Sequence, residues 1–295
     1  MAHQSIIGGV YAHPFAVIAV MAALLLPLST LAQTSYDDLV NYNSSLREAS
    51  GVGRARAVMA RYDTLHAAPA NALRAASDAA LEDRFRSTTL VFVYSLSKKH
   101  AEDLKRIGME LERRGKLSPW HAGEIAGAFV AVRDIEGLRW ARRRWPATQL
   151  PEFPTLAGLG GNVIEVNTLT QLTRRQLDLH RLQVVAVVHP SCGFSQRALQ
   201  DIATRPEYAW LRARLILLVP PETSLPIVGI HAWNAVHSDL PMRLMSSREE
   251  WRMLPSLDTP TFYPVSDATV RDSTEGWPNP MLARLATAVA ADAGD

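Results

Sequence analysis

Apolar positions in the first part of the chain recur at helical spacing. Residues 79–97 and 101–114 carry apolar side chains at three- and four-residue steps. Ser118 followed by Pro119 is typical of a helix start, because serine caps the first turn and proline has no N–H that needs a partner there. No useful length of residues 36–145 alternates with a period of two. The pattern therefore predicts an all-helical domain, with boundaries at 33–146.

The pattern changes after this segment. Prolines and glycines are dense in residues 147–160, which disfavours helix and strand interiors and predicts a linker. Residues 162–167 then alternate apolar and polar as a strand does, and residues 182–188 form a continuous apolar run typical of a strand buried on both faces. The spacing of apolar residues between them predicts an amphipathic helix over 169–180. Strands that alternate with helices indicate a sheet covered by helices. The further elements expected are a helix at 191–203, strands at 211–219 and 261–266, and a last helix at 279–291.

The first residues have the pattern of an export signal. An apolar run at 15–26 is followed by Pro27 and by the small-x-small site Thr30-Leu31-Ala32. This order predicts a signal peptide at 1–32, although the segment contains no lysine or arginine. A retained amino-terminal anchor is the alternative, but the run is shorter than the roughly 20 residues that a membrane-spanning helix needs. We expect a periplasmic or secreted protein without a membrane span after cleavage.

Composition limits the partners and the means of stabilisation. The chain is 47% hydrophobic and 20% charged, with a formal net charge of +2. This near balance does not indicate nucleic acid or an anionic membrane as a partner. A single cysteine cannot form an intramolecular disulfide. The protein is therefore expected to be held together by the packing of its cores.

The one cysteine, Cys192, follows directly after the apolar run at 182–188. If Ser191 caps the next helix, the amides of the first turn and the helix dipole point at the sulfur and favour its thiolate. His189 and Arg197 are candidates for additional positive charge, and a purely structural role is the alternative for both. The turn that contains the cysteine reads His189-Pro190-Ser191-Cys192-Gly193-Phe194-Ser195.

A second landmark, Thr259-Pro260-Thr261-Phe262, follows later in the chain. Together with the Cys-Gly-Phe-Ser motif it resembles the thioredoxin-like superfamily, over about residues 161–291. The resemblance implies an α/β thioredoxin-like domain at 161–295, with a central mixed sheet flanked by helices. More chain lies at about 220–255 than the minimal fold needs, and a helical insertion is expected there.

The resemblance also implies the site. In this superfamily the peptide bond before the proline is cis, and the backbone of the preceding residue, here Thr259, lies beside the reactive thiol, where it can pair with a peptide or a thiol ligand. Cys192 is then the catalytic residue. The expected binding residues are Ser191, Gly193, Phe194, Ser195, His189, Thr259 and Pro260.

Ser195 occupies the position of a second, resolving cysteine. A serine hydroxyl does not attack a mixed disulfide at a useful rate, so the thiol depends on a partner for its second sulfur. The motif is identical to that of monothiol glutaredoxins, which hold an iron–sulfur cluster with glutathione, but their lysine before the motif and their glycine pair after the proline are missing here. We expect no cofactor. The spacing of His231, His237 and Asp239 fits no closed metal site, and no metal is expected.

Two functions of different classes are consistent with these residues. The first is an exported protein that uses Cys192 for thiol–disulfide exchange, as a monothiol oxidoreductase, or for mixed disulfides with protein partners. The alternative is a redox-inactive scaffold that binds one dedicated protein through its helical domain and its insertion. The exposure of Cys192 distinguishes them, because a thiol buried under Phe194 and the insertion cannot react with another protein.

Overall fold

The computed structural model describes residues 34–67, 70–278 and 286. From Thr34 onward these residues belong to one compact unit. The predicted signal peptide and most of the predicted helix at 279–291 lie outside the described residues. Within the described part, no helix is long and apolar enough to cross a membrane.

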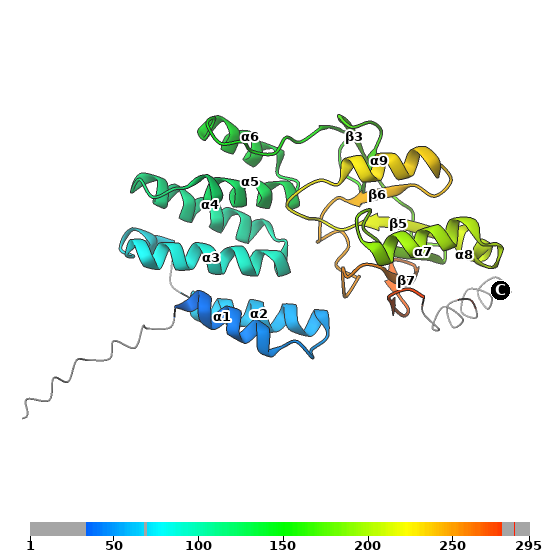
Figure 1. The fold of residues 1–295 in the computed structure, drawn as a ribbon, viewed down its shortest axis with the longest axis horizontal. Coiled ribbons are helices and arrows are strands. Elements are labelled where there is room, and N and C mark those ends of the chain that lie inside the picture. The colour runs from blue at the N-terminus through cyan, green and yellow to red at the C-terminus, as the bar shows by residue number, and fades with distance from the viewer. Residues whose placement is uncertain (1–33, 68–69, 279–285, 287–295) are drawn as a thin grey trace, which may run out of the picture. The chain divides into compact units, whose positions relative to one another are not determined.

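The first half of the described chain is helical, as the apolar spacing predicts, and runs from blue to green in Figure 1. Its longest helices begin and end within a few residues of the predicted limits. The elements are α1 (Ser35–Ser45), α2 (Gly51–Leu65), the short 3-10 helix η1 (Ala70–Arg74), α3 (Asp78–Ser95), α4 (Lys98–Arg113), α5 (Pro119–Ala131) and α6 (Ile135–Arg144).

The start of α5 has the predicted cap. Ser118 is its N-cap residue and Pro119 its first helical residue. The Ser118 hydroxyl accepts from the His121 amide at 3.4 Å, and the Ser118 amide donates to Nδ1 of the His121 ring at 2.9 Å. This reciprocal pair satisfies two backbone N–H groups that a helix start leaves open. The apolar side of α5 then enters the core of the helical half, where Ile125 and Phe129 are fully buried.

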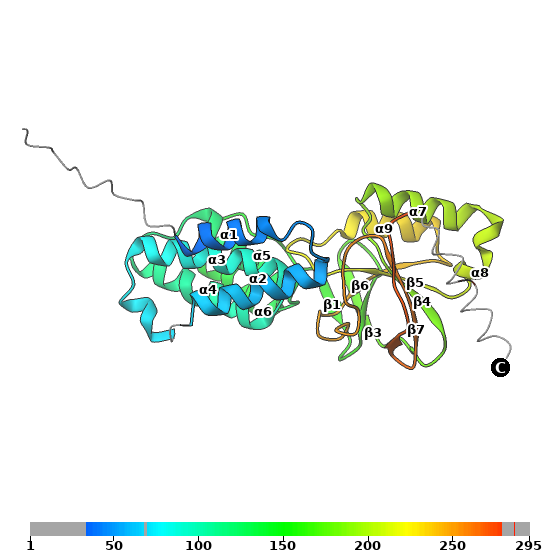
Figure 2. The same cartoon turned by 90° about the horizontal axis from the view of Figure 1, so that it is seen from below.

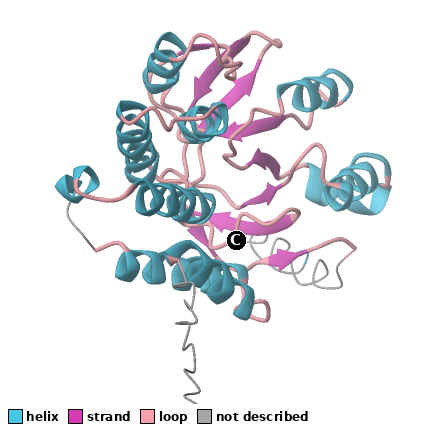
Figure 3. Cartoon of the chain, turned by 60° about the vertical axis from the view of Figure 1, so that its left-hand side comes forward, coloured by secondary structure: helices cyan, strands magenta, loops and turns pink. Residues whose placement is uncertain are grey.

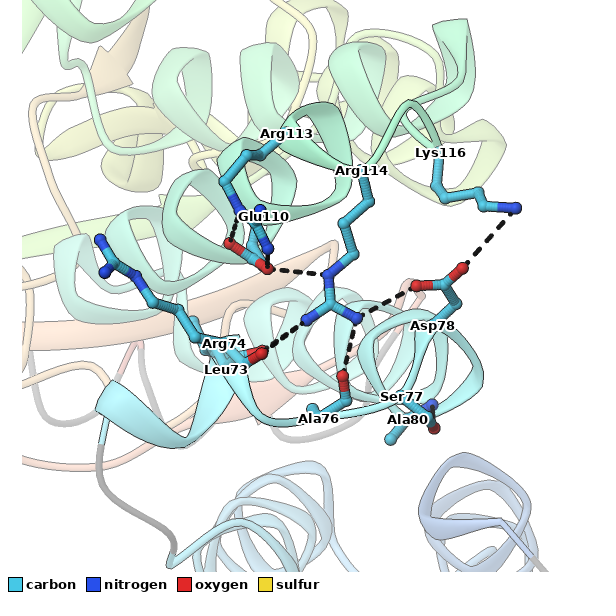
Figure 4. Close-up of polar contacts among 10 residues, drawn as sticks. All are labelled: Leu73, Arg74, Ala76, Ser77, Asp78, Ala80, Glu110, Arg113, Arg114 and Lys116. Atoms are coloured by element: carbon cyan, nitrogen blue, oxygen red, sulfur yellow. Dashed lines mark hydrogen bonds and ion pairs between the residues drawn. The ribbon is translucent and has the colours of Figure 1, made fainter.

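Arg114, the C-cap residue of α4, ties this helix to the segment before α3 (Figure 4). Its guanidinium donates to the backbone carbonyls of Leu73, Arg74 and Ala76 at 2.7–3.1 Å. It also pairs with Glu110, and hydrogen bonds from Arg113 and from Arg114 lower the pKa of Glu110 to about 2. One cation therefore satisfies carbonyls that a helical turn would otherwise leave open.

Two histidines of the helical half, the partly exposed His66 and the buried His100, lie beside Tyr62. The rings of His66 and His100 lie 4.7 Å and 5.4 Å from the Tyr62 ring, centroid to centroid. Nδ1 of His100 is hydrogen-bonded to the hydroxyls of Ser95 and Ser97. Nε2 of each histidine is buried without a hydrogen-bond partner among the described residues. Protonation of either ring would place a positive charge at a buried nitrogen that has no hydrogen-bond acceptor.

Burial lowers the pKa of both His66 and His100 below the ordinary value of 6.5, and the neighbouring cations Arg84 and Lys99, respectively, act in the same direction. In the range just below pH 6.5 these two histidines therefore bind more protons in the unfolded chain than in the folded chain. The free energy of unfolding falls as the pH falls through this range. Glu110 affects stability at lower pH, because the stabilisation from its ionised carboxylate is lost only as the pH falls below the ordinary pKa of 4.5.

We therefore expect the protein to lose stability between pH 7.5 and about pH 5.5, by at most about 1.4 kcal/mol for each histidine and pH unit. The loss is smaller for His66, whose partial exposure lets water screen the charge. Chemical denaturation at the two pH values measures it, and the double variant His66→Gln/His100→Gln should flatten the dependence. An unchanged pH dependence in that variant would contradict the assignment.

The second half is an α/β arrangement around one mixed sheet. Within the described residues nine strands take part, in the order β1-β3-β2-β6-β5-β4-β7-β8, with β9 also paired to β7. Figure 3 shows these strands in magenta. The elements are β1 (Thr155–Ala157), β2 (Val163–Val166), β3 (Gln171–Arg175), β4 (Gln183–Val187), α7 (Gly193–Thr204), the 3-10 helix η2 (Pro206–Tyr208), α8 (Ala209–Arg212), β5 (Leu215–Val219), α9 (Ile227–Val236), β6 (Met242–Met245), β7 (Thr261–Ser266), β8 (Thr269–Val270) and β9 (Thr274–Glu275).

Each face of this sheet has its own apolar layer. On one face α7 and α9 pack on the strands, and Figure 2 shows both helices on the same side of the sheet. The other face is covered by loop residues, chiefly Trp251 and Leu254. Successive residues of β4 alternate between the two layers, with Val184 and Ala186 in one and Val185 and Val187 in the other. The continuous apolar run is thus buried on both faces, as predicted.

Three expectations of the sequence are wrong or incomplete here. The segment predicted as a helix over 169–180 contains β3, which pairs antiparallel with β2. The insertion at 220–255 is not purely helical, because after α9 it supplies β6, which lies in the sheet between β5 and β2. The predicted linker at 147–160 contains β1. In each case a short segment gains its hydrogen bonds from another strand, the neighbouring β2 for β3 and strands farther away in the chain for β1 and β6. Spacing within the segment itself does not reveal such a partner.

The register of the central strands brings two loops together. β4 runs parallel to β5 and antiparallel to β7, and Val187 at the end of β4 pairs with Thr261 at the start of β7. The turn after β4 and the loop before β7 therefore meet at the same end of these two strands. These two loops contain Cys192 and Pro260.

Candidate functional site

Cys192 lies at the start of α7, directly before the first helical residue, whereas the sequence predicts a helix that already includes it. The structure makes Cys192 itself the N-cap residue, with no side-chain capping bond, and α7 begins at Gly193. The condition considered from the sequence, that Ser191 caps this helix, is not met, and the Ser191 hydroxyl lies 2.8 Å from Nδ1 of the His189 ring instead. The sulfur still faces the first-turn amides, which a helix leaves without intrahelical partners.

Thr259 and Pro260 lie across from the thiol, as predicted. The Thr259–Pro260 peptide bond is cis. The thiol of Cys192 donates to the carbonyl oxygen of Thr259, with the sulfur 3.4 Å from the oxygen. Pro260 itself is buried, whereas Thr259 is partly exposed. The predicted pairing of these two loops is therefore present in the fold.

The surroundings of the sulfur favour its ionised form. Burial by itself opposes ionisation, and the Thr259 carbonyl, an acceptor, favours the protonated thiol. Hydrogen bonds from the Thr259 and Ser195 hydroxyls and from the amides of Ser195 and Phe194 outweigh both, and lower the pKa of Cys192 from 9.0 to about 7. About half of the thiol is then a thiolate at neutral pH.

Ser195 is fully buried beneath the turn. Its hydroxyl accepts a hydrogen bond from the backbone amide of His189 at 3.2 Å and helps to lower the pKa of Cys192. The side chain at the resolving position thus holds the turn closed and faces the sulfur. It offers no second thiol.

The outer side of the site is open. Cys192 is partly exposed, and Phe194 is 55% exposed and does not cover it. The guanidinium of Arg197 stacks on the Phe194 ring at 4.6 Å rather than pairing with the sulfur. From the insertion, α9 packs closely on the turn, since a Cβ at Gly229 would lie 2.8 Å from Cβ of Pro190. The thiol is therefore accessible to another molecule.

His189 does not face the sulfur as a source of charge. Its Nε2 lies 2.8 Å from a carboxylate oxygen of Glu222, and its Nδ1 accepts from the amide of Ser191 at 3.2 Å. Sequence reasoning missed Glu222, which lies 33 residues from its partner. No local pattern around it marks it, although it directly follows the two prolines after the strand beside β4.

The two histidines considered for metal binding lie in α9 and at its end. His231 lies within α9. His237 caps the end of α9 and stacks on the Trp233 ring, with the centroids 3.9 Å apart. Within the described part of the chain, no three histidine, cysteine or acidic side chains come together in a way that could hold a metal ion.

Comparisons with known proteins give this chain no relative. No protein-family model matches it, and neither does a curated protein or a solved structure.

Proposed function

We propose that this chain is a thioredoxin-like protein that uses the single thiol of Cys192 to form mixed disulfides with protein partners. The observation that carries the proposal is the setting of that thiol. It is partly exposed, it lies at the start of a helix beside Thr259, and its pKa is lowered to about 7. A structural cysteine is normally buried in apolar surroundings, which raise its pKa.

The topology around the thiol supports the proposal. β4 leads into α7, β5 lies parallel to β4 on one side, and β7 lies antiparallel on the other. β8 continues from β7 as a hairpin. This is the order of strands that the resemblance to the thioredoxin-like superfamily implies for the part of the sheet that holds the thiol.

The chemistry needs a disulfide on the partner. The Cys192 thiolate attacks one sulfur of that disulfide, a new S–S bond forms, and the other partner sulfur leaves as a thiolate that takes a proton from water. The product is a mixed disulfide. Because Ser195 cannot attack it, release requires a thiol from a second molecule, and the adduct is long-lived. Partners with disulfides are typical of the exported location that the signal sequence predicts.

The test is the pH dependence of Cys192 alkylation in the full chain. The rate with iodoacetamide should rise with a midpoint near pH 7, because only the thiolate reacts. The Cys192→Ser variant, which has no thiol, should take up no label and controls for reaction elsewhere. A midpoint at or above about 8.5, the value of a free cysteine, would remove the basis of the proposal.

A second function is supported by the helical half. Val93, Met109 and Trp120 are exposed on α3, α4 and α5 although the half has its own buried core. Such residues suit a scaffold that binds one protein without redox chemistry. If Cys192→Ser leaves partner capture in cell extracts unchanged, the scaffold function is the correct one.

A further inference from the structure

A chain of hydrogen bonds leads from the turn that contains the thiol to Glu222. The Ser191 hydroxyl and amide both contact Nδ1 of His189, at 2.8 Å and 3.2 Å. Because the amide can only donate, Nδ1 is the acceptor, and the proton of the neutral ring is on Nε2. This N–H donates to Glu222 at 2.8 Å. The carboxylate thus fixes both the tautomer and the orientation of the imidazole.

The backbone of His189 is tied to the same turn. Its carbonyl accepts from the Cys192 amide at 3.1 Å, and its amide donates to the Ser195 hydroxyl at 3.2 Å. With the two bonds from Ser191 to the ring, one residue holds Ser191, Cys192 and Ser195 at once. If the ring turned away, the residue directly before the thiol would lose both of its contacts.

Glu222 is in turn placed against the helical half. It lies in the segment between β5 and α9, next to Thr223, and α5 packs so closely there that a Cβ at Gly127 would lie 2.9 Å from Cβ of Thr223. The guanidinium of Arg133, which follows α5, is buried and interacts electrostatically with Glu222. Arg133 also reaches the carbonyl of Met245 in β6 at 3.5 Å.

We propose that His189 and Glu222 are positioning residues for Cys192, and that the helical half, through α5 and Arg133, keeps Glu222 in place. The inference rests on the proposed function of the thiol. It assigns to the helical half a role in the reactivity of the thiol rather than in partner binding alone.

Two effects of Glu222 on the thiolate have opposite signs, which makes the inference testable. The negative charge by itself disfavours a second anion nearby, so removing the charge would speed alkylation. The hydrogen bond to His189 acts through the geometry of the turn, so removing it would slow alkylation. Glu222→Gln removes the charge but keeps a carbonyl oxygen that accepts from Nε2. Glu222→Ala removes both.

We expect Glu222→Ala to alkylate about five- to tenfold more slowly than wild type at pH 7, as the midpoint moves toward the free-cysteine value of about 8.5. Glu222→Gln should stay within about twofold of wild type. Thermal unfolding of each variant verifies that the fold is intact. Faster alkylation in both variants, unchanged rates in both, or an equally slow Glu222→Gln would each overturn the positioning role.

The link to the helical half has a matched pair of variants. Gly127→Ala pushes a Cβ against Thr223, the neighbour of Glu222, and should slow alkylation at least twofold. Gly123→Ala, on the same helix, meets no atom within 4 Å and should react at the wild-type rate. Equal rates in the two variants would overturn the link.

These measurements separate the two proposals. A wild-type midpoint near 8.5 would end the proposed function before any variant is considered. A wild-type midpoint near 7, with all variants unchanged, would leave the proposed function standing and end this inference alone.

Discussion

Replacing Ser195 with cysteine is expected to turn a stoichiometric thiol into a dithiol that releases its partners. Ser195 lies three residues after Cys192, in the first turn of α7, and its hydroxyl and amide already interact with the Cys192 sulfur. A sulfur at this position would attack the mixed disulfide from within the same molecule. Its effective concentration is about millimolar or higher, compared with about 10 µM for an external thiol, so release should be at least about 100-fold faster.

The measurement is the decay of a mixed disulfide preformed on Cys192 with a chromophoric thiol. Ser195→Ala is the matched control, since it removes the hydroxyl without adding a sulfur and should show no faster release. Mass spectrometry of the oxidised Ser195→Cys variant should find two hydrogens fewer, for an internal disulfide. Two free thiols after oxidation, or release at the wild-type rate, would contradict the arrangement of α7 around Cys192.

The sequence predicts those elements that local chemistry determines. The start of α5 follows from Ser118 and Pro119, and β4 and β7 follow from runs of apolar and β-branched residues. The prediction for 169–180 failed because the seven-residue step from Leu172 to Leu179 fits a helix, whereas pairing with β2 makes Gln171–Arg175 a strand. Spacing within one segment does not show whether that segment pairs with another strand.

The candidate site shows the same division. Cys192, Thr259 and Pro260 could be placed together because their motif resembles a known family. The N-cap residue is Cys192 rather than Ser191, whose hydroxyl is hydrogen-bonded to the His189 ring, and this ring also contacts Glu222. The contact with Glu222 comes from another loop, so the residues around the thiol alone could not reveal it.

The segment 220–255 is rich in aromatic and methionine residues, which can serve either packing or partner choice. The structure favours packing for Trp251. Trp251 is fully buried, and its Nε1 donates to the carbonyl of Asn162 at 2.6 Å. Its ring belongs to the apolar layer with Met245 and Leu254, on the face of the sheet that no helix of the described part covers. Trp251 therefore helps to cover the apolar side chains of this face, as α7 and α9 do on the other face.

We expect Trp251→Ala to lower the free energy of unfolding by about 3–5 kcal/mol, because it removes a large apolar surface and leaves a cavity that the loop can only partly fill. Most of the loss comes from packing, since the Asn162 carbonyl keeps a second donor, the Ser246 amide at 3.1 Å. Trp251→Phe retains much of the ring and should cost clearly less. Urea denaturation of the three proteins gives the values. A loss below about 1 kcal/mol in Trp251→Ala would mean that Trp251 is not a core residue, and that the aromatic residues of this segment serve a partner instead.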